Sequence, residues 1–147
     1  MQELIARAKE LLADGTVTRV LGWKAGDLPY NPEAAYFETA ESLDEFVYNG
    51  FCGQNLSKMM IEASKLEGKT LVCLKPCDTY SFNQLIKEHR VDREKAYIIG
   101  VGCKGKLDVE MLRKMGIKGI QSISGAELTD DCEILNVSTI YGDKTVA

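Results

Sequence analysis

Apolar and polar positions alternate with two different periods along the first half of the chain. A helical period runs through 2–12 and 53–68, and a capping pattern followed by mixed residues predicts a third helix over 39–49. Alternating β-branched residues over 16–23 and the short run 34–38 are typical of strands. Glycine and proline between these two runs indicate a loop.

The middle of the chain has a different pattern, in which apolar residues follow one another without alternation. Two such runs, 69–75 and 95–102, are separated by a helical pattern over 81–90, and another helical pattern follows over 106–116. Continuous apolar strands separated by helices are typical of parallel sheets that are covered on both faces. We therefore expect a partly parallel sheet with helices on both faces.

The C-terminal part is rich in β-forming residues. A third strand is predicted over 117–124, and the tail 132–147 is expected to be β-rich with a Gly-Asp turn. The chain has 147 residues, of which 45% are hydrophobic, and this is enough for one core. These features predict a single α/β domain over 1–147, with a β-rich C-terminal tail.

Charge and hydropathy exclude several classes of function. The net charge is −4 and no aromatic residue interleaves with a basic run, which argues against binding to nucleic acid or to an anionic membrane. The apolar runs are far shorter than a membrane span, so no membrane insertion is expected. Glu3 and Glu10 interrupt the N-terminal apolar residues, so a signal peptide is not indicated and a cytoplasmic protein is expected.

Five cysteines make thiol chemistry the main functional signal. Their odd number argues against a disulfide framework. Cys77 and Cys103 each follow one of the two continuous apolar strands. Neighbouring parallel strands in a right-handed βαβ unit end at the same edge of the sheet, where ligands bind in open α/β folds. We therefore expect these two thiols to lie close together, although 26 positions separate them.

The local settings of the cysteines differ. Cys52, Cys77 and Cys103 each precede a predicted helix, whose N-terminal N–H groups would stabilise a thiolate. Cys73 lies inside an apolar strand and is expected to be a core residue. Cys132 lies between two acidic residues and is a weaker candidate.

Other chemistry-bearing residues give weaker signals. Lys104 and Lys106 lie in a glycine-rich segment and are placed to neutralise an anion. His89, the only histidine, is expected at the surface, and one histidine cannot build a metal-ligand cluster or a Ser/His/Asp set. Trp23 and Tyr30 flank a loop, where core packing is the default and a flavin or partner surface is the alternative.

Three cysteine motifs resemble those of a known family. "FCGQNL", "LKPCDTYSFNQLI" and "YIIGVGCKGKLD", in this order, resemble the coenzyme F-420 hydrogenase/dehydrogenase beta-subunit family over residues 23–108. Members are iron–sulfur flavoproteins that pass electrons. Many of them also carry a ferredoxin-like Cys-x-x-Cys-x-x-Cys segment and a larger flavin-binding part, and this chain contains neither.

The resemblance implies an iron–sulfur role for specific residues. The thiols of Cys52, Cys77 and Cys103 would hold or approach a 4Fe–4S cluster, and Cys132, a partner chain or a substrate would supply the fourth ligand. Neighbouring residues of the same motifs would belong to the cofactor site, and these are Asn55, Asp78 and Lys104.

Three functions remain open from the sequence. The preferred one is an electron-transfer subunit or domain of an oxidoreductase complex, with a cluster and a flavin such as FAD shared with a partner. Its partners would be other subunits of a redox complex or a ferredoxin-like protein, and a homo-oligomer is left open. The second is a cofactor-free interaction module that docks onto a larger oxidoreductase and exposes Trp23, Tyr30 and Phe51. The third is a thiol redox protein with a reversible Cys77–Cys103 disulfide, which the absence of Cys-x-x-Cys disfavours.

Overall fold

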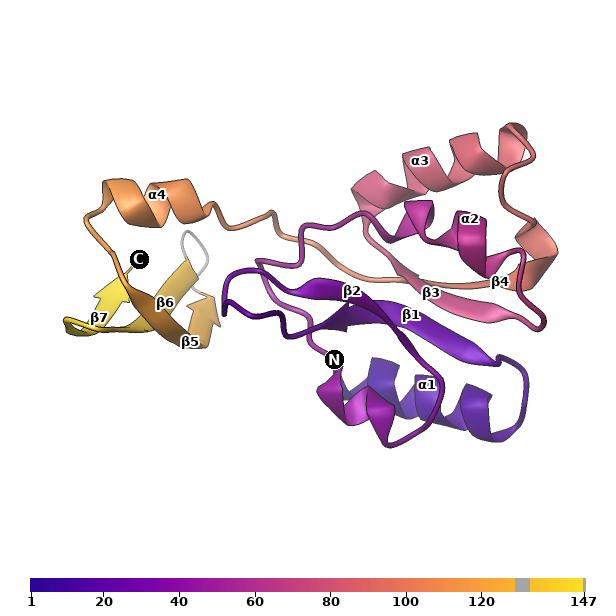
Figure 1. Ribbon diagram of the computed structural model, residues 1–147, viewed down its shortest axis with the longest axis horizontal. Helices are drawn as coiled ribbons and strands as arrows, with labels where there is room; N and C mark the ends of the chain where they lie inside the picture. Colours follow the sequence, from indigo (N-terminus) through magenta and orange to yellow (C-terminus); the bar gives the residue numbers. More distant parts are fainter. Residues whose placement is uncertain (129–132, 147) are drawn as a thin grey trace.

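Two β-sheets form the framework of the chain (Figure 1). The computed structural model describes residues 1–128 and 133–146. The first sheet has the strand order β2-β1-β3-β4, and its strands are β1 (Arg19–Lys24), β2 (Glu33–Phe37), β3 (Thr70–Leu74) and β4 (Ala96–Gly100). The second sheet has the order β5-β6-β7, and its strands are β5 (Ile120–Leu128), β6 (Glu133–Thr139) and β7 (Gly142–Val146).

Helices cover both faces of the first sheet. The α-helices are α1 (Gln2–Ala13), α2 (Met60–Ala63), α3 (Pro76–Lys87) and α4 (Val109–Lys114), and the 3-10 helices are Ser42–Glu45, Leu56–Lys58 and Arg93–Lys95. α1 lies on one face, whereas α2 and α3 lie on the other (Figure 1). The strands β1, β3 and β4 run parallel, and β2 is antiparallel to β1. This arrangement confirms the predicted α/β class with a partly parallel sheet.

The core of this sheet follows from the apolar pattern. All five residues of β3 are buried, as expected for a central parallel strand. Ala8 and Leu11 of α1 pack in the same cluster as Phe82 of α3 and Met60 of α2. α1 ends at Ala13 with Asp14 as its C-cap, and Gly15 follows with a φ of 75°, a conformation that suits glycine.

Two of the predicted helices are wrong in extent. Only Ser42–Glu45 is helical within 39–49, and it is a 3-10 turn. The chain then becomes extended, because Phe46 forms a β-bridge with Lys24 and the amide of Val47 donates to the carbonyl of Trp23. The helix predicted over 53–68 is reduced to the turn Leu56–Lys58 and the single turn of α2. In both segments the helical pattern marks buried apolar residues rather than a continuous helix.

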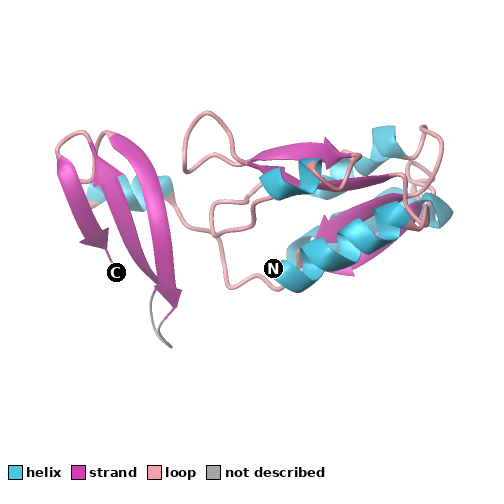
Figure 2. Ribbon diagram, turned by 90° about the horizontal axis from the view of Figure 1, so that it is seen from below, coloured by secondary structure: helices cyan, strands magenta, loops and turns pink. Residues whose placement is uncertain are grey.

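The C-terminal strands form a separate antiparallel sheet (Figure 2). The third strand predicted over 117–124 becomes the start of β5, so it extends this second sheet instead of the parallel one. The β-rich tail is confirmed over 133–146, but the predicted Gly-Asp turn is wrong in position. Gly142 and Asp143 begin β7, and the turn between β6 and β7 falls at Ile140 and Tyr141. A second apolar cluster lies between this sheet and α4, and its buried members are Phe51, Leu112, Ile117, Leu135 and Val137.

Among the described residues, no helix combines the length and the apolar character that crossing a bilayer requires.

Candidate functional site

A cavity of about 870 Å³ opens beside the C-terminal ends of β3 and β4. Three segments that are distant in sequence form its walls, namely residues 48–53, the start of α3, and the loop 102–106. The structure brings Cys52, Cys77 and Cys103 together as lining residues of this one cavity. Its location matches the edge at which open α/β sheets bind ligands.

The parallel register explains how Cys77 and Cys103 reach the same edge. Leu74 pairs with Gly100, and the amide of Val101 donates to the carbonyl of Leu74 at 2.9 Å. α3 begins at Pro76, directly after β3, so that Cys77 is the second residue of the helix. Cys77 and Cys103 are both exposed, and each is therefore accessible from the cavity.

Cys52 has a different environment, because its side chain is buried. The amide of Asn49 donates to its Sγ at 3.4 Å. Burial raises the pKa of the Cys52 thiol, although the N–H of Asn49 and the ammonium of Lys75 oppose the effect. The expectation that a helix N-terminus stabilises this thiol as a thiolate is wrong, since the nearest following helical segment is the 3-10 turn that begins at Leu56.

Lys75 is a buried cation beneath the cavity. It follows β3, and its side chain is 6% exposed. Its Nζ donates to the carbonyl of Cys52 at 2.7 Å and to that of Gln54 at 3.3 Å. Asp78 Oδ2 lies 3.7 Å from the same Nζ, and the ammonium lies 5.1 Å from the centroid of a Trp23 ring. A buried ammonium requires such partners, since it has lost its hydration.

Tyr48 connects two walls of the cavity. Its hydroxyl donates to the carbonyl of Gly102 at 2.7 Å, and its ring packs against Trp23 with 5.3 Å between the ring centroids. Burial raises the pKa of Tyr48 to about 12, and the neighbouring Cys103 adds to the effect. Tyr48 therefore remains a neutral hydrogen-bond donor over the physiological pH range.

The remaining predicted site residues occupy different positions. Lys104 lines the cavity. Asp78 is buried behind Lys75, where its carboxylate accepts from the backbone N–H of Lys75 at 3.4 Å. Asn55 does not line the cavity, because its side chain accepts from the amide of Ser57 at 2.9 Å and donates to Ser81 Oγ at 2.7 Å. Cys132 lies outside the described residues.

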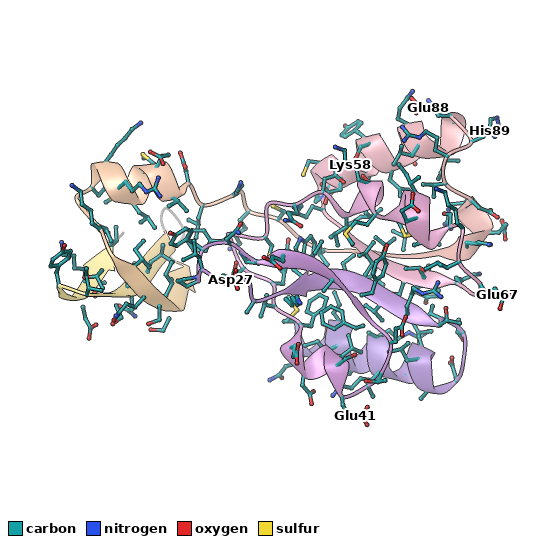
Figure 3. The ribbon with its side chains drawn as sticks, in the orientation of Figure 1. Asp27, Glu41, Lys58, Glu67, Glu88 and His89 are labelled. Carbon is teal, nitrogen blue, oxygen red and sulfur yellow. The ribbon has the colours of Figure 1, made fainter. Side chains whose placement is uncertain are left out.

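The predicted core position of Cys73 is confirmed. Its side chain is fully buried in β3, and burial raises its pKa to about 12. His89 is exposed beyond the C-terminal end of α3, next to Glu88 and at the opposite end of this helix from the cavity (Figure 3). It adopts a φ of 56°, in the left-handed region that ends many helices.

The prediction of an exposed aromatic patch, which belonged to the interaction-module hypothesis, is wrong. Trp23 is fully buried, and its Nε1 donates to the carbonyl of Gln54 at 3.3 Å. Phe51 is buried in the second cluster, and Tyr30 is partly buried against it. The default interpretation of Trp23 as a core residue is therefore confirmed.

Comparisons with known proteins show which proteins the chain is similar to. No family model matches the chain. The chain is 28% identical to the F420-dependent formate dehydrogenase 1 subunit beta of Methanococcus maripaludis over 109 residues, which cover 71% of the chain and 28% of that protein. It is 26% identical to the F420-dependent formate dehydrogenase subunit beta of Methanocaldococcus jannaschii over 107 residues, covering 73% of the chain and 28% of that protein.

A solved structure has the same fold. A chain of the F420-reducing [NiFe] hydrogenase complex from Methanosarcina barkeri superposes with a TM-score of 0.69 and 18% sequence identity, covering 97% of this chain and 52% of that one. The resemblance to the coenzyme F-420 hydrogenase/dehydrogenase beta-subunit family is confirmed. The alignments span little more than a quarter of the length of the two curated relatives of that family.

The F-420 beta-subunit resemblance implies a 4Fe–4S cluster, and the donors around the cavity include thiols, lysines and backbone groups. Thiolates are the usual ligands of iron–sulfur clusters. In the part of the chain that the structure describes, no three His, Cys, Asp or Glu side chains are grouped to hold one metal ion. A four-iron cluster takes one thiolate on each iron, so its ligands stand apart around a shared space. Cys52, Cys77 and Cys103 line one cavity, so the type of donor that such a cluster uses is present there.

Sequence reasoning missed Lys75 and Tyr48. A usable signal for Lys75 was its place between a fully apolar strand and a helix-starting proline, since a lysine there must bury its stem at the ligand-binding edge. Tyr48 carried no such signal, because it lies in a segment whose pattern predicted a helix. Lys106, which the sequence places with Lys104 to neutralise an anion, lines the same cavity.

Proposed function

We propose that the chain is an electron-transfer part of an oxidoreductase-complex subunit, and that its cavity is where a redox cofactor is held or approached. One observation carries the proposal, namely that Cys52, Cys77 and Cys103 come from three separate segments and line the same cavity. The proposed cofactor is a 4Fe–4S cluster, with a flavin such as FAD shared with a partner. The fourth ligand to the cluster would come from Cys132, a partner chain or a substrate.

The charges around the cavity are consistent with this role. Lys75, Lys104 and Lys106 line it, and no Asp or Glu is among the lining residues within the part of the chain that the structure describes. Positive charge near a cluster offsets the negative charge of its thiolates and affects its reduction potential. The bound group would supply the redox chemistry, while the protein would fix its distance, burial and surroundings.

The relatives support the proposed partners. Both curated relatives are beta subunits of F420-dependent formate dehydrogenases, and the solved structure is an F420-reducing hydrogenase complex. We extend this arrangement to the present chain, so that its partners would be the other subunits of a redox complex. A cytoplasmic location is part of the same proposal.

The test is the cofactor content of the anaerobically purified chain, alone and after reconstitution with iron and sulfide. The expected result is roughly four iron and four sulfide per chain and a broad visible absorbance that dithionite bleaches. Flavin is measured separately by its fluorescence after acid release. A colourless protein without iron, sulfide or flavin under all these conditions would contradict the proposal.

The two other functions predict different results from the same material. An interaction module would remain colourless and would keep its binding after Cys52, Cys77 and Cys103 are replaced by serine. A thiol redox protein would lose two free thiols on mild oxidation and recover them on reduction. Thiol counting with and without oxidant therefore identifies a thiol redox protein, and the cofactor content separates the other two functions.

A further inference from the structure

The carbonyl of Cys52 and the Nζ of Lys75 are 2.7 Å apart, and from this contact we propose that Lys75 is a positioning residue for Cys52. Its ammonium would hold the loop 52–54 at the end of β3, so that the thiol of Cys52 stays at the cavity. The redox meaning of this inference rests on the proposed function, whereas the positioning itself concerns only the protein.

Hydrogen bonds to Asp78 fix the backbone of Lys75. Its own N–H donates to Asp78 Oδ2 at 3.4 Å, and its carbonyl accepts from the N–H of Asp78 at 2.9 Å. These two contacts join the end of β3 to the first turn of α3. The Lys75 side chain therefore starts at the junction between β3 and α3, which also carries Cys77.

The far end of the side chain crosses to the loop 50–54, which carries the buried side chains of Phe51 and Cys52. Gly50 and Gly53 flank Phe51 and Cys52, and glycine allows the backbone many conformations. The ammonium donates to two carbonyls of this loop, those of Cys52 and Gln54. Hydrogen bonds from a charged donor are stronger than those between neutral groups, particularly where water is excluded.

The carbonyl of Gln54 has a second donor, whereas the backbone of Cys52 is otherwise held through its N–H, which donates to the carbonyl of Asn49 at 3.1 Å. Trp23 Nε1 donates to the carbonyl of Gln54, and the amide of Ala34 donates to Gln54 Oε1 at 2.9 Å. Gln54 is thus anchored to β1 and β2, whereas the shortest contact of Lys75 is at Cys52. One side chain therefore connects the segment of Cys77 to the segment of Cys52.

The experiment measures how fast N-ethylmaleimide labels each cysteine in the full-length, cofactor-free protein, read by peptide mass spectrometry. Cys52 is buried and should react slowly, and Lys75→Met should raise its labelling rate by about ten- to a hundredfold, since a charged hydrogen bond restrains the loop. Cys103 is exposed and should keep its rate. Lys75→Arg, which retains a charged donor, should restore much of the protection.

Cys73 serves as the internal control for folding, because it is buried in β3. If Lys75→Met exposes Cys73 as well, the double variant Lys75→Met/Asp78→Asn replaces it, since it leaves no buried carboxylate without its ammonium. The variant that keeps Cys73 protected decides the test, and an unchanged labelling rate of Cys52 in it would overturn the proposal. If the double variant still exposes Cys73, an unchanged labelling rate of Cys52 in that variant would also overturn it. The labelling is done without cofactor. The proposed positioning role of Lys75 can therefore be contradicted while cluster binding succeeds, and the reverse.

Discussion

Phe51 and Cys52 are consecutive residues whose side chains are buried in two different cores. Cys52 packs with the residues of the four-stranded sheet, whereas Phe51 packs with α4 and the second sheet. The backbone repeats this connection, because the amide of Leu107 donates to the carbonyl of Gly50 at 2.8 Å. The loop that forms one wall of the cavity is therefore also the attachment point of the C-terminal unit.

Replacing Phe51 by alanine should loosen the C-terminal unit more than the parallel sheet. Loss of a buried phenylalanine from a small cluster should lower the local free energy of opening by about 3 kcal/mol. Hydrogen exchange should therefore become faster in β6 and stay slow in β3. Tyr80→Ala is the matched control, because Tyr80 is 82% exposed and its removal should change neither rate.

The same measurement tests whether residues 1–147 behave as a single domain. If Phe51→Ala raises the exchange rates of β3 and β6 equally, the two cores open together and the localised effect is contradicted.

Cofactor content should depend on the cysteines of the cavity and not on the cysteine of the core. Cys77→Ala should remove most of the iron from the anaerobically reconstituted protein, because it deletes an exposed thiol at the cavity. Cys73→Ala should keep the iron, because Cys73 is fully buried within β3. The measurement is iron per chain together with visible absorbance. Equal loss from both variants would contradict the argument that strand ends deliver the ligands.

The parallel part of the fold and the shared edge of Cys77 and Cys103 could be predicted because both follow from local patterns. Continuous apolar runs indicated β3 and β4, and the handedness of the crossover places their ends together. The helix over 39–49 was wrong because pairing with β1 competes with a weak helical preference. Propensity gives way to tertiary contacts in such segments.

The burial of Cys52 and the contact between Lys75 and its carbonyl could not be predicted for a different reason. Both depend on where the loop 50–54 lies relative to the end of β3, and no periodic pattern encodes that relationship. Asn55 was assigned to the site because it shares a motif with Cys52, whereas its amide is directed to Ser57 and Ser81. Proximity in sequence indicated the correct cavity but not every residue that lines it.

Asn55 should affect stability rather than cofactor content. Asn55→Ala removes the acceptor that caps the turn Leu56–Lys58 and the donor to Ser81, and it should lower the free energy of unfolding by about 1–2 kcal/mol. Asn55→Asp keeps the acceptor and loses the donor, so its effect should be smaller. Urea unfolding of the three proteins checks this order. A loss of iron in Asn55→Ala with unchanged stability would instead favour the cofactor role predicted from the sequence.

Stability should fall as the pH rises above about 9, because of the buried thiol of Cys73. In the unfolded chain this thiol has the ordinary pKa of about 9, and in the folded protein burial raises the pKa to about 12. Between these values the unfolded chain has released the proton while the folded protein retains it. The contribution of the Cys73 thiol to the free energy of unfolding is therefore complete below pH 9. Between pH 9 and pH 12 this contribution decreases by about 1.4 kcal/mol per pH unit.

The matched comparison is wild type against Cys73→Ala, followed by urea unfolding from pH 8 to pH 10.5. The variant should be less stable at pH 8, because it loses buried side-chain volume, but its stability should decrease less steeply above pH 9. Cys52, whose pKa is also raised by burial, is present in both proteins and contributes a slope of the same sign to each. The difference between the two slopes therefore isolates Cys73, and parallel slopes would show that this thiol does not titrate differently in the folded and unfolded states.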